Sequence, residues 1–304
     1  MKKLRMILAA MALLLCGSAM AKDALVIIAH GSPGTKWNAP VLALEETVRA
    51  ELAKRGDKQF EYVRVALMEF SQPNIASVMR DCEAQGVDRV FAVPLFIAPS
   101  SHSEEDIPNI LGHKYSAATM AALLEEKAEI VDTKMEIVLG ATLSTSDILG
   151  EVMAERVKAL SQNAAEEGVV LLAHGDWNYR GFWETMLKEA GERVEKETGV
   201  KYLDGTFVAM GQQFKEDALA IVQRATAEKK RVIVQGVYLS TGVKVMADYT
   251  GTTKAVEELL QGTGKEVIFS DKGILPESTE RVSQWIVDQA EGWAAGHAPS
   301  NESK

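Results

Sequence analysis

Short, wholly apolar runs punctuate this chain, and segments with helical spacing of apolar residues lie between them. The first run, residues 24–29, stops at His30 and is followed by a loop of glycine and proline. Such a run predicts a strand that is buried on both faces of a parallel sheet. Residues 168–173 repeat the strand, and His174-Gly175 repeats the histidine and the glycine 144 positions later. A recurrence at that distance indicates a duplicated domain.

Strand and helix patterns alternate through both halves, which predicts α/β domains with parallel sheets and helices on both faces. We therefore expect two tandem domains with a cleft between them. The predicted strands lie at 24–29, 62–67, 89–97, 135–139, 168–173, 202–209, 231–239 and 265–269, and a closing helix spans about 277–293. The predicted division is a signal peptide (1–21), a first domain (22–143), a second domain (144–295) and a tail (296–304).

The N-terminus has the features of a secretory signal peptide. Three basic residues among the first five precede an apolar stretch at 6–15 and the small-residue site Ala19-Met20-Ala21. This order predicts export to the periplasm with cleavage after Ala21. No later segment is apolar over the length of a membrane span, so we expect no membrane insertion of the mature chain.

Composition narrows the class of protein. The chain has 304 residues, of which 47% are hydrophobic, enough for two ordinary domains. Cleavage leaves Cys82 as the only cysteine and so excludes an internal disulfide. Cleavage also removes three of the 33 basic residues and none of the 43 acidic ones, for a net charge of −13. This surplus argues against nucleic acid and anionic lipid as partners.

Three polar residues follow three successive predicted strands of the first half: His30, Glu69 and His102. The carboxyl ends of parallel strands share one edge of a sheet, so these side chains are expected to converge on one crevice. Two imidazoles and a carboxylate suit Co²⁺, Fe²⁺, Ni²⁺ or Zn²⁺, and the same groups accept protons near neutral pH. The alternatives are structural: a hydrogen-bonded histidine at a strand end, and a carboxylate that stabilises a helix start.

Other catalytic templates fit less well. The loop after residue 30 matches neither a dinucleotide fingerprint nor a Walker loop, and no GxSxG elbow is present. By contrast, His30-Gly-Ser and the segments 66–75 and 93–108 resemble, in order and spacing, the three signature segments of the sirohydrochlorin chelatases. These class II chelatases are relatives of ferrochelatase that insert cobalt or iron into a tetrapyrrole without ATP. The duplication resembles their two-domain form, with two chelatase-like domains around a cleft.

The resemblance implies a role for each of these residues. His30 and His102 would be the metal ligands, and Glu69 would contact the substrate. The metal is a substrate, Co²⁺ first with Fe²⁺ or Ni²⁺ as alternatives, and no organic cofactor is expected. A wall against the macrocycle would be formed by Phe96, Ile97, Ala98, Pro99, Ser100 and Ser101.

The second half departs from the family pattern. Alignment of His174 with His30 places Lys244 at the position of the second histidine, and the counterpart of Glu69 falls near Met210 or Gly211. We therefore interpret the second half as a degenerate copy, with His174 as a second candidate site. The residues after His174 would either line the cleft or pack the domain interface: Trp177, Asn178, Tyr179 and Arg180.

The predicted activity is that of a lyase that inserts a divalent metal into a sirohydrochlorin-type tetrapyrrole. The expected partner is this tetrapyrrole, and the chain could also form homo-oligomers. One alternative is a non-enzymatic periplasmic metal- or haem-binding protein, and another is a ligand-binding receptor for a transporter. Two features conflict with the family's usual setting: the predicted export, and a negative charge that would repel a polycarboxylate. Local attraction would then have to come from Lys36, Arg180 and Lys244.

Overall fold

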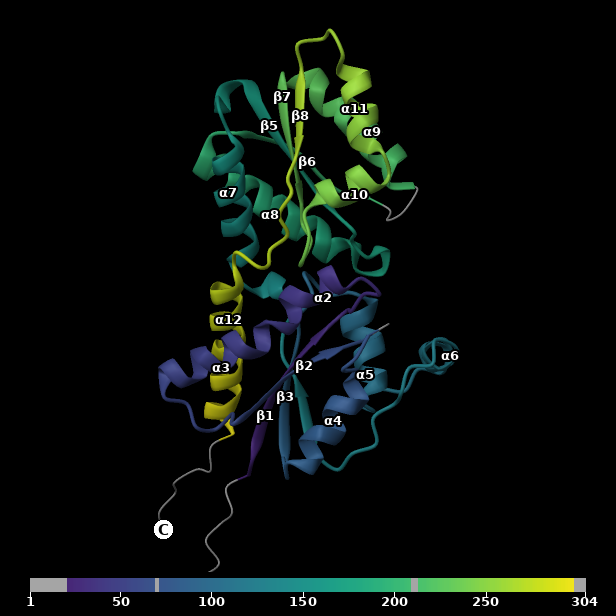
Figure 1. Cartoon of the computed structure of the whole chain (residues 1–304), viewed down its shortest axis with the longest axis vertical. Coiled ribbons are helices and arrows are strands. Elements are labelled where there is room, and N and C mark those ends of the chain that lie inside the picture. The colour runs from purple at the N-terminus through teal and green to yellow at the C-terminus, as the bar shows by residue number, and fades with distance from the viewer. Residues whose placement is uncertain (1–20, 69–70, 209–212, 298–304) are drawn as a thin grey trace, which may run out of the picture.

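The computed structural model describes residues 21–68, 71–208 and 213–297 (Figure 1). Almost all of the predicted signal peptide and most of the predicted tail lie outside these residues. The described chain forms two stacked lobes, and each lobe is built on a four-stranded parallel sheet with helices on both faces. This architecture confirms the predicted α/β fold class.

The two sheets have the same topology, which the duplication in the sequence predicted. The strand orders are β2-β1-β3-β4 and β6-β5-β7-β8, and all neighbouring strands are parallel. All eight predicted strands are present: β1 (Asp23–Ala29), β2 (Tyr62–Leu67), β3 (Arg89–Pro94), β4 (Glu136–Leu139), β5 (Glu167–Ala173), β6 (Lys201–Phe207), β7 (Arg231–Gly236) and β8 (Glu266–Phe269).

The third strand of each lobe ends three residues earlier than predicted. β3 stops at Pro94, which has no N–H to extend the ladder. The chain then turns: Leu95 N still donates to Ile28 O at 2.7 Å, and Phe96 N donates back to Pro94 O at 2.8 Å. The last apolar residues of the predicted strand therefore form a loop above the sheet edge rather than part of the sheet.

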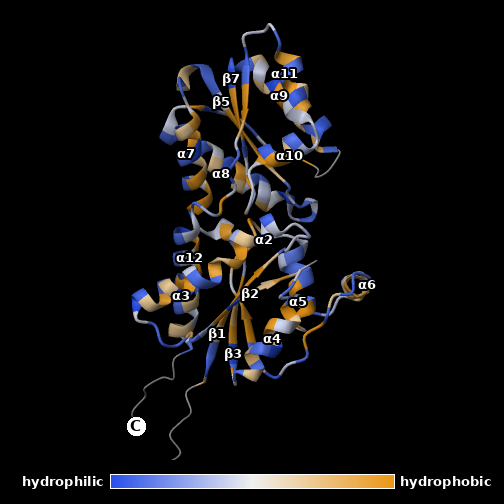
Figure 2. Cartoon of the chain, in the orientation of Figure 1, coloured by the Kyte–Doolittle hydropathy of each residue, from blue (hydrophilic) through white to orange (hydrophobic). Residues whose placement is uncertain are grey.

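Alternate residues of the central strand β1 face two different cores. Leu25 and Ile27 belong to the cluster that includes residues of α3 (Leu44–Arg55), while Val26 and Ile28 belong to the cluster on the opposite face with α4 (Ile75–Ala84). Both faces of the strand are therefore buried, which explains its uninterrupted apolar sequence. Figure 2 shows the hydrophobic strands between helices whose outer faces are hydrophilic.

The remaining helices cover the two sheets, and none in the described part of the chain is long and apolar enough to cross a membrane. Asn74 caps α4 by accepting a hydrogen bond from Ser77 N. The first helical segment begins at Thr35. The other helices are α2 (Thr35–Leu42), α5 (Ile107–Ile110), α6 (Ala117–Glu125), α7 (Ile148–Leu160), α8 (Arg180–Thr198), α9 (Gln213–Glu228), α10 (Val243–Tyr249), α11 (Thr252–Leu260) and α12 (Thr279–Gly296).

The last helix of each half is exchanged between the lobes. α7 follows β4 of the first sheet but packs on α8 in the second lobe, and α12 follows β8 of the second sheet but packs on α3 in the first lobe (Figure 1). The predicted second domain, residues 144–295, thus includes a helix, α12, that packs on the first lobe. Its amphipathic pattern showed that one face is buried but did not show in which lobe.

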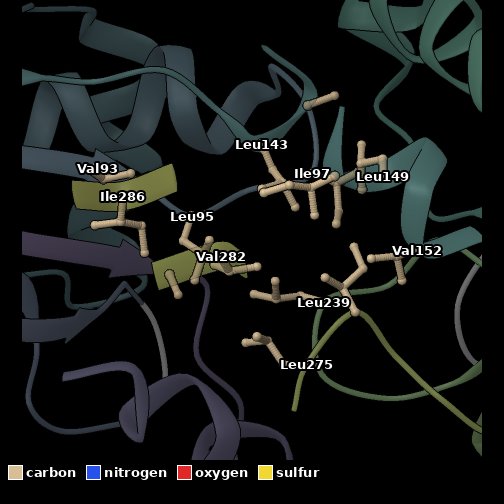
Figure 3. Packing of buried hydrophobic residues seen from close by; sticks show 14 of the residues in the cluster. Val93, Leu95, Ile97, Leu143, Leu149, Val152, Leu239, Leu275, Val282 and Ile286 are labelled. Atoms are coloured by element: carbon tan, nitrogen blue, oxygen red, sulfur yellow. The ribbon is translucent and has the colours of Figure 1, made fainter. Parts of the chain in front are cut away.

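One of the hydrophobic cores, the one on the α3 face of the first sheet, runs through both lobes as a result of this exchange. Figure 3 shows side chains from both sheets' loops and from both exchanged helices in one cluster. Complete burial of one such side chain contributes about 1.5–3 kcal/mol. The cluster therefore holds the lobes together through residues that include Leu95, Ile97, Leu143, Leu149, Val152, Leu239, Leu275, Val282 and Ile286.

A buried ion pair joins the first residues of the two central strands in each lobe. Asp23 of β1 is fully buried and accepts two hydrogen bonds from Arg89 of β3, both 2.7 Å long. In the second lobe, Glu167 of β5 and Arg231 of β7 form the same pair at 2.5 Å. The duplication therefore extends to an interaction at the edge of the sheet opposite the cleft.

Replacement of Asp23 by alanine leaves the Arg89 guanidinium without its buried acceptor. We expect Asp23→Ala to lower the free energy of unfolding by about 3–5 kcal/mol, measured by urea denaturation. The control is Asp288→Ala, which breaks an exposed ion pair with Arg55 and is expected to cost less than about 1 kcal/mol. An equal decrease in the free energy of unfolding in the two variants would contradict the stabilising role of the Asp23–Arg89 pair.

Candidate functional site

A cavity of about 400 Å³ lies between the two lobes, at the carboxyl ends of their central strands. Loops after β1 and β3 form one side, and loops after β5 and β7 form the other. We call this cavity the cleft. Most of its lining is apolar or aromatic, and among the described residues none that line it is lysine or arginine: His30, Gly31, Ser32, Pro33, Trp37, Leu95, Phe96, Ile97, Ser100, His102, His174, Gly175, Asp176, Trp183, Val237, Tyr238 and Leu239.

Two of the three predicted first-half residues meet in the cleft. His30 directly follows β1, and His102 begins a short π-helical turn (His102–Asp106) beyond β3. The centroids of their rings are 4.9 Å apart, with an angle of 74° between the planes. The predicted convergence of these two histidines is therefore observed, whereas Glu69 lies outside the described residues.

Hydrogen bonds orient both imidazole rings. His30 Nδ1 donates to the carbonyl oxygen of Gly31 at 2.6 Å, and His102 Nδ1 donates to Asp106 Oδ2 at 2.7 Å. In a neutral ring that donates through Nδ1, the lone pair lies on Nε2. A carbonyl or carboxylate partner on the other ring nitrogen is typical of histidines that bind metals.

The loop after His30 depends on the conformation of Gly31. Its φ of +89° lies in the region that side chains with a Cβ avoid. The next residue, Ser32, is held through its carbonyl oxygen, which accepts hydrogen bonds from Asn38 Nδ2 at 2.8 Å and Ser71 Oγ at 2.7 Å. The glycine therefore allows the turn that presents its carbonyl to the His30 ring.

His174 repeats the local geometry of His30 in the second lobe. Its Nδ1 donates to Gly175 O at 2.9 Å, and Gly175 has a φ of +73°. His174 is exposed and lines the same cleft as the first two histidines. In the described part of the chain, no three histidine, cysteine or acidic side chains lie close enough to hold one metal ion. His174 is therefore a third imidazole in the cleft without being a third ligand of the His30–His102 pair.

The structure places three of the six residues of the predicted wall in the lining of the cleft. Phe96, Ile97 and Ser100 line the cleft. Ala98 does not, because it is fully buried in the shared core. Pro99 and Ser101 are also absent from the lining. Their backbone atoms bond to the second lobe. An apolar loop residue can face either a ligand or a core, and the sequence does not distinguish these.

Apart from His174, the candidate residues of the second half lie outside the cleft lining. Lys244 pairs with Asp248 four residues later, the same spacing as His102 and Asp106. Trp177 lies outside the cleft lining and contacts Phe207, with ring centroids 5.2 Å apart. Of the two predicted roles for the residues after His174, the interface role fits Asn178, which bonds to Ser101.

Sequence reasoning missed Asp106, the hydrogen-bond partner of His102, and several residues that line the cleft. Asp106 had a signal, because its spacing from His102 places both on one face of a helical turn. The others come from the opposite lobe or from a neighbouring loop and had no signal in the local pattern: Trp37, Asp176, Trp183, Tyr238 and Leu239. Burial raises the pKa of the Tyr238 hydroxyl, which has no hydrogen-bond partner among the described residues.

Comparison with known proteins identifies the first half. The model of the CbiX family matches residues 24–160. Similar proteins include the sirohydrochlorin cobaltochelatase of Saccharolobus solfataricus, 26% identical over 132 residues (43% of this chain, 91% of the relative). That of Methanocaldococcus jannaschii is 34% identical over 90 residues (30% of this chain, 59% of the relative). The first half of this chain is therefore similar to the sirohydrochlorin chelatases. The predicted resemblance is thereby confirmed.

Solved structures extend the likeness to the whole fold. SirB from Bacillus subtilis with Fe³⁺ superimposes with a TM-score of 0.64 at 16% identity, over 91% of this chain and 98% of SirB. SirB of Bacillus subtilis subspecies spizizenii in complex with cobalt gives 0.61 at 16% identity, over 91% and 97%. At this identity the likeness concerns the fold, and it shows that a chelatase can have this two-lobed arrangement.

The turn at Gly31 yields a test of the site's geometry. We expect Gly31→Ala to lower the free energy of unfolding by about 1–2 kcal/mol, because alanine is strained at positive φ. Urea denaturation measures this loss. The control is Gly181→Ala in α8, where a Cβ meets nothing within 4 Å and helix propensity favours alanine. A Gly31→Ala variant as stable as the parent would show that the turn tolerates a side chain.

Proposed function

We propose that the chain inserts a divalent metal ion into a sirohydrochlorin-type tetrapyrrole without ATP, as a lyase. The observation that carries this proposal is the His30–His102 pair, two imidazoles with 4.9 Å between ring centroids at the base of an apolar cleft. The names of the relatives, sirohydrochlorin cobaltochelatases, support the same reaction.

The pair supplies two functions that metal insertion requires. The ion must first lose water and be held weakly enough to be passed on, and two imidazole nitrogens suit this better than a closed four-ligand site. The ring must then lose two N–H protons as two metal–nitrogen bonds form. After they release the ion, the Nε2 atoms of His30 and His102 would each be able to accept one proton. Glu69, which follows β2, would balance the charge of the ion.

The walls of the cleft suit a flat macrocycle. Trp37 and Phe96 flank the histidine pair, with ring centroids 6.2 Å from His30 and 6.1 Å from His102 respectively. Trp183 and Leu239 contribute from the second lobe. Aromatic and aliphatic surfaces of this kind bind an apolar ring, and a few polar groups fix its orientation. The carboxylates of the substrate would then project toward the mouth of the cleft.

Cobalt is the proposed metal, because the relatives are named cobaltochelatases. Iron and nickel are the alternatives, because imidazole ligands suit these ions as well. His174, on the opposite side of the same cleft, is a further candidate proton acceptor. Simple retention of a metal would call for more ligands than the two imidazoles of the first lobe. We therefore favour transfer over storage by a binding protein. The export predicted from the N-terminus stays a prediction.

Turnover by variants tests the proposal directly. We expect the parent protein to convert sirohydrochlorin to its cobalt form, followed by anaerobic absorbance, much faster than a protein-free control. His102→Ala should lower the rate by at least about 100-fold, the scale of losing a proton acceptor. Lys244→Ala removes the residue at the matching place of the second lobe and should change the rate less than about twofold, because Lys244 lies outside the cleft lining.

Two results would contradict the proposal. One is a parent protein that does not exceed the protein-free control with Co²⁺, Fe²⁺ or Ni²⁺. The other is a Lys244→Ala variant that loses as much activity as His102→Ala, which would move the chemistry to the second lobe. Tight retention of pigment or metal without turnover would favour the binding-protein alternative.

The carboxylate behind His102 gives a second test. We expect Asp106→Asn to weaken Co²⁺ binding by about 10-fold or more, because a partner on the other ring nitrogen orients a ligating histidine. Asp248→Asn is the matched control, since Asp248 has the same spacing from Lys244. Isothermal titration calorimetry of the metal-free protein with Co²⁺ measures the affinity of both variants. Unchanged affinity in Asp106→Asn would contradict the role of this carboxylate.

A further inference from the structure

The second lobe touches the segment that carries His102 through several hydrogen bonds. Two segments face each other: residues 176–183, which follow His174 in the second lobe, and residues 99–105, which hold His102 in the first. Asp176 Oδ2 accepts from Ser101 N at 2.7 Å, and Trp183 Nε1 donates to Pro99 O at 2.9 Å. Asn178 Nδ2 donates to Ser101 Oγ at 3.2 Å. These bonds end on the residues directly before His102.

The Asp176 carboxylate is the charged member of this contact. Partial burial raises its pKa, but hydrogen bonds from Ser101 and from the backbone of Asn178 and Tyr179 outweigh burial, so the pKa lies below its ordinary value. Asp176 is therefore ionised at neutral pH. Hydrogen bonds to an ionised acceptor are stronger than neutral ones, so this contact restrains Ser101 more than a neutral pair would.

Trp183 adds a buried contact to the same loop. Its side chain is only 6% exposed, and its indole N–H would be buried without a partner if Pro99 moved away. The neighbouring Ala98 is fully buried in the shared core. The loop before His102 is therefore fixed by packing on one side and by the second lobe on the other.

We propose that the 176–183 segment of the second lobe is a positioning element for His102. Asp176, Asn178 and Trp183 hold residues 99–101, and through them they set the place of the His102 ring relative to His30. The second lobe, which has Lys244 in place of the second histidine, thus contributes to the site of the first. This inference rests on the proposed function only in taking His102 as a metal ligand.

A role in holding the lobes together is the alternative explanation of these contacts. The exchanged helices already do so, through a core that includes residues of α7 and α12. Loss of one hydrogen bond at the 176–183 segment is therefore expected to leave the lobes assembled while it loosens the loop before His102. A change in the metal site without a matching change in stability distinguishes positioning from general cohesion.

The experiment uses the full chain, free of metal and tetrapyrrole, titrated with Co²⁺ and followed by the visible absorbance of the bound ion. We expect Asp176→Ala and Trp183→Phe each to weaken binding by about 10-fold and to alter the Co²⁺ spectrum. Asp176→Asn keeps one acceptor oxygen for Ser101 and should recover part of the affinity, which it would not do if Asp176 itself bound the ion. Thermal unfolding of each variant is measured alongside.

Two further variants complete the test. Asn178 is exposed, so Asn178→Ala is expected to fold and to weaken Co²⁺ binding a few-fold, the scale of one neutral hydrogen bond. Ser283→Ala removes a hydrogen bond of 2.8 Å between α12 and Thr47 of α3, away from the cleft, and should leave Co²⁺ binding unchanged.

The outcomes separate this inference from the proposed function. If His102→Ala abolishes Co²⁺ binding while Asp176→Ala, Trp183→Phe and Asn178→Ala bind like the parent, the positioning role is overturned and the metal site stands. If Ser283→Ala weakens binding as much as Asp176→Ala, the contacts act through general stability and the inference is again overturned. If the parent does not bind Co²⁺, or His102→Ala binds it equally well, the proposed function itself is wrong.

Discussion

The exchange of α7 and α12 between the lobes is the constraint on which the rest of the structure depends. Each half of the chain lends its last helix to the other, so the core on one face of both sheets is continuous (Figure 3). Two domains joined only by linkers move relative to each other by default. Here a large apolar core joins them, and the cleft between them has two walls with a defined spacing.

The chemistry of the cleft is divided unequally between these walls. The first lobe supplies the His30–His102 pair, and the second supplies apolar surface, a third imidazole and the hydrogen bonds that reach the loop before His102. The two copies are therefore not two equal sites. The first carries the histidine pair, and the second carries the residues that bond to the loop before His102. The shared placement of Lys244–Asp248 and His102–Asp106 shows where the two copies diverged.

The sequence predicted the elements of this structure better than their contacts. Apolar runs located all eight strands, and the rule that parallel strands align their carboxyl ends correctly predicted that His30 and His102 meet. The lobe in which α12 packs was not predictable, because amphipathicity shows that a face is buried but not its partner. Ala98 and Asp176 illustrate the same limit: the first faces a core and the second bonds across the cleft, and neither contact leaves a periodic signal.

In the proposed reaction, the His30–His102 pair holds the metal ion before the ion enters the ring. Crystals of the full chain soaked with Co²⁺, with anomalous scattering recorded at the cobalt edge, test this most directly. We expect a cobalt peak about 2.1 Å from Nε2 of both histidines, the usual length of a metal–imidazole bond. A cobalt peak only beside His174, or only at sites outside the cleft, would contradict the proposed role of the His30–His102 pair.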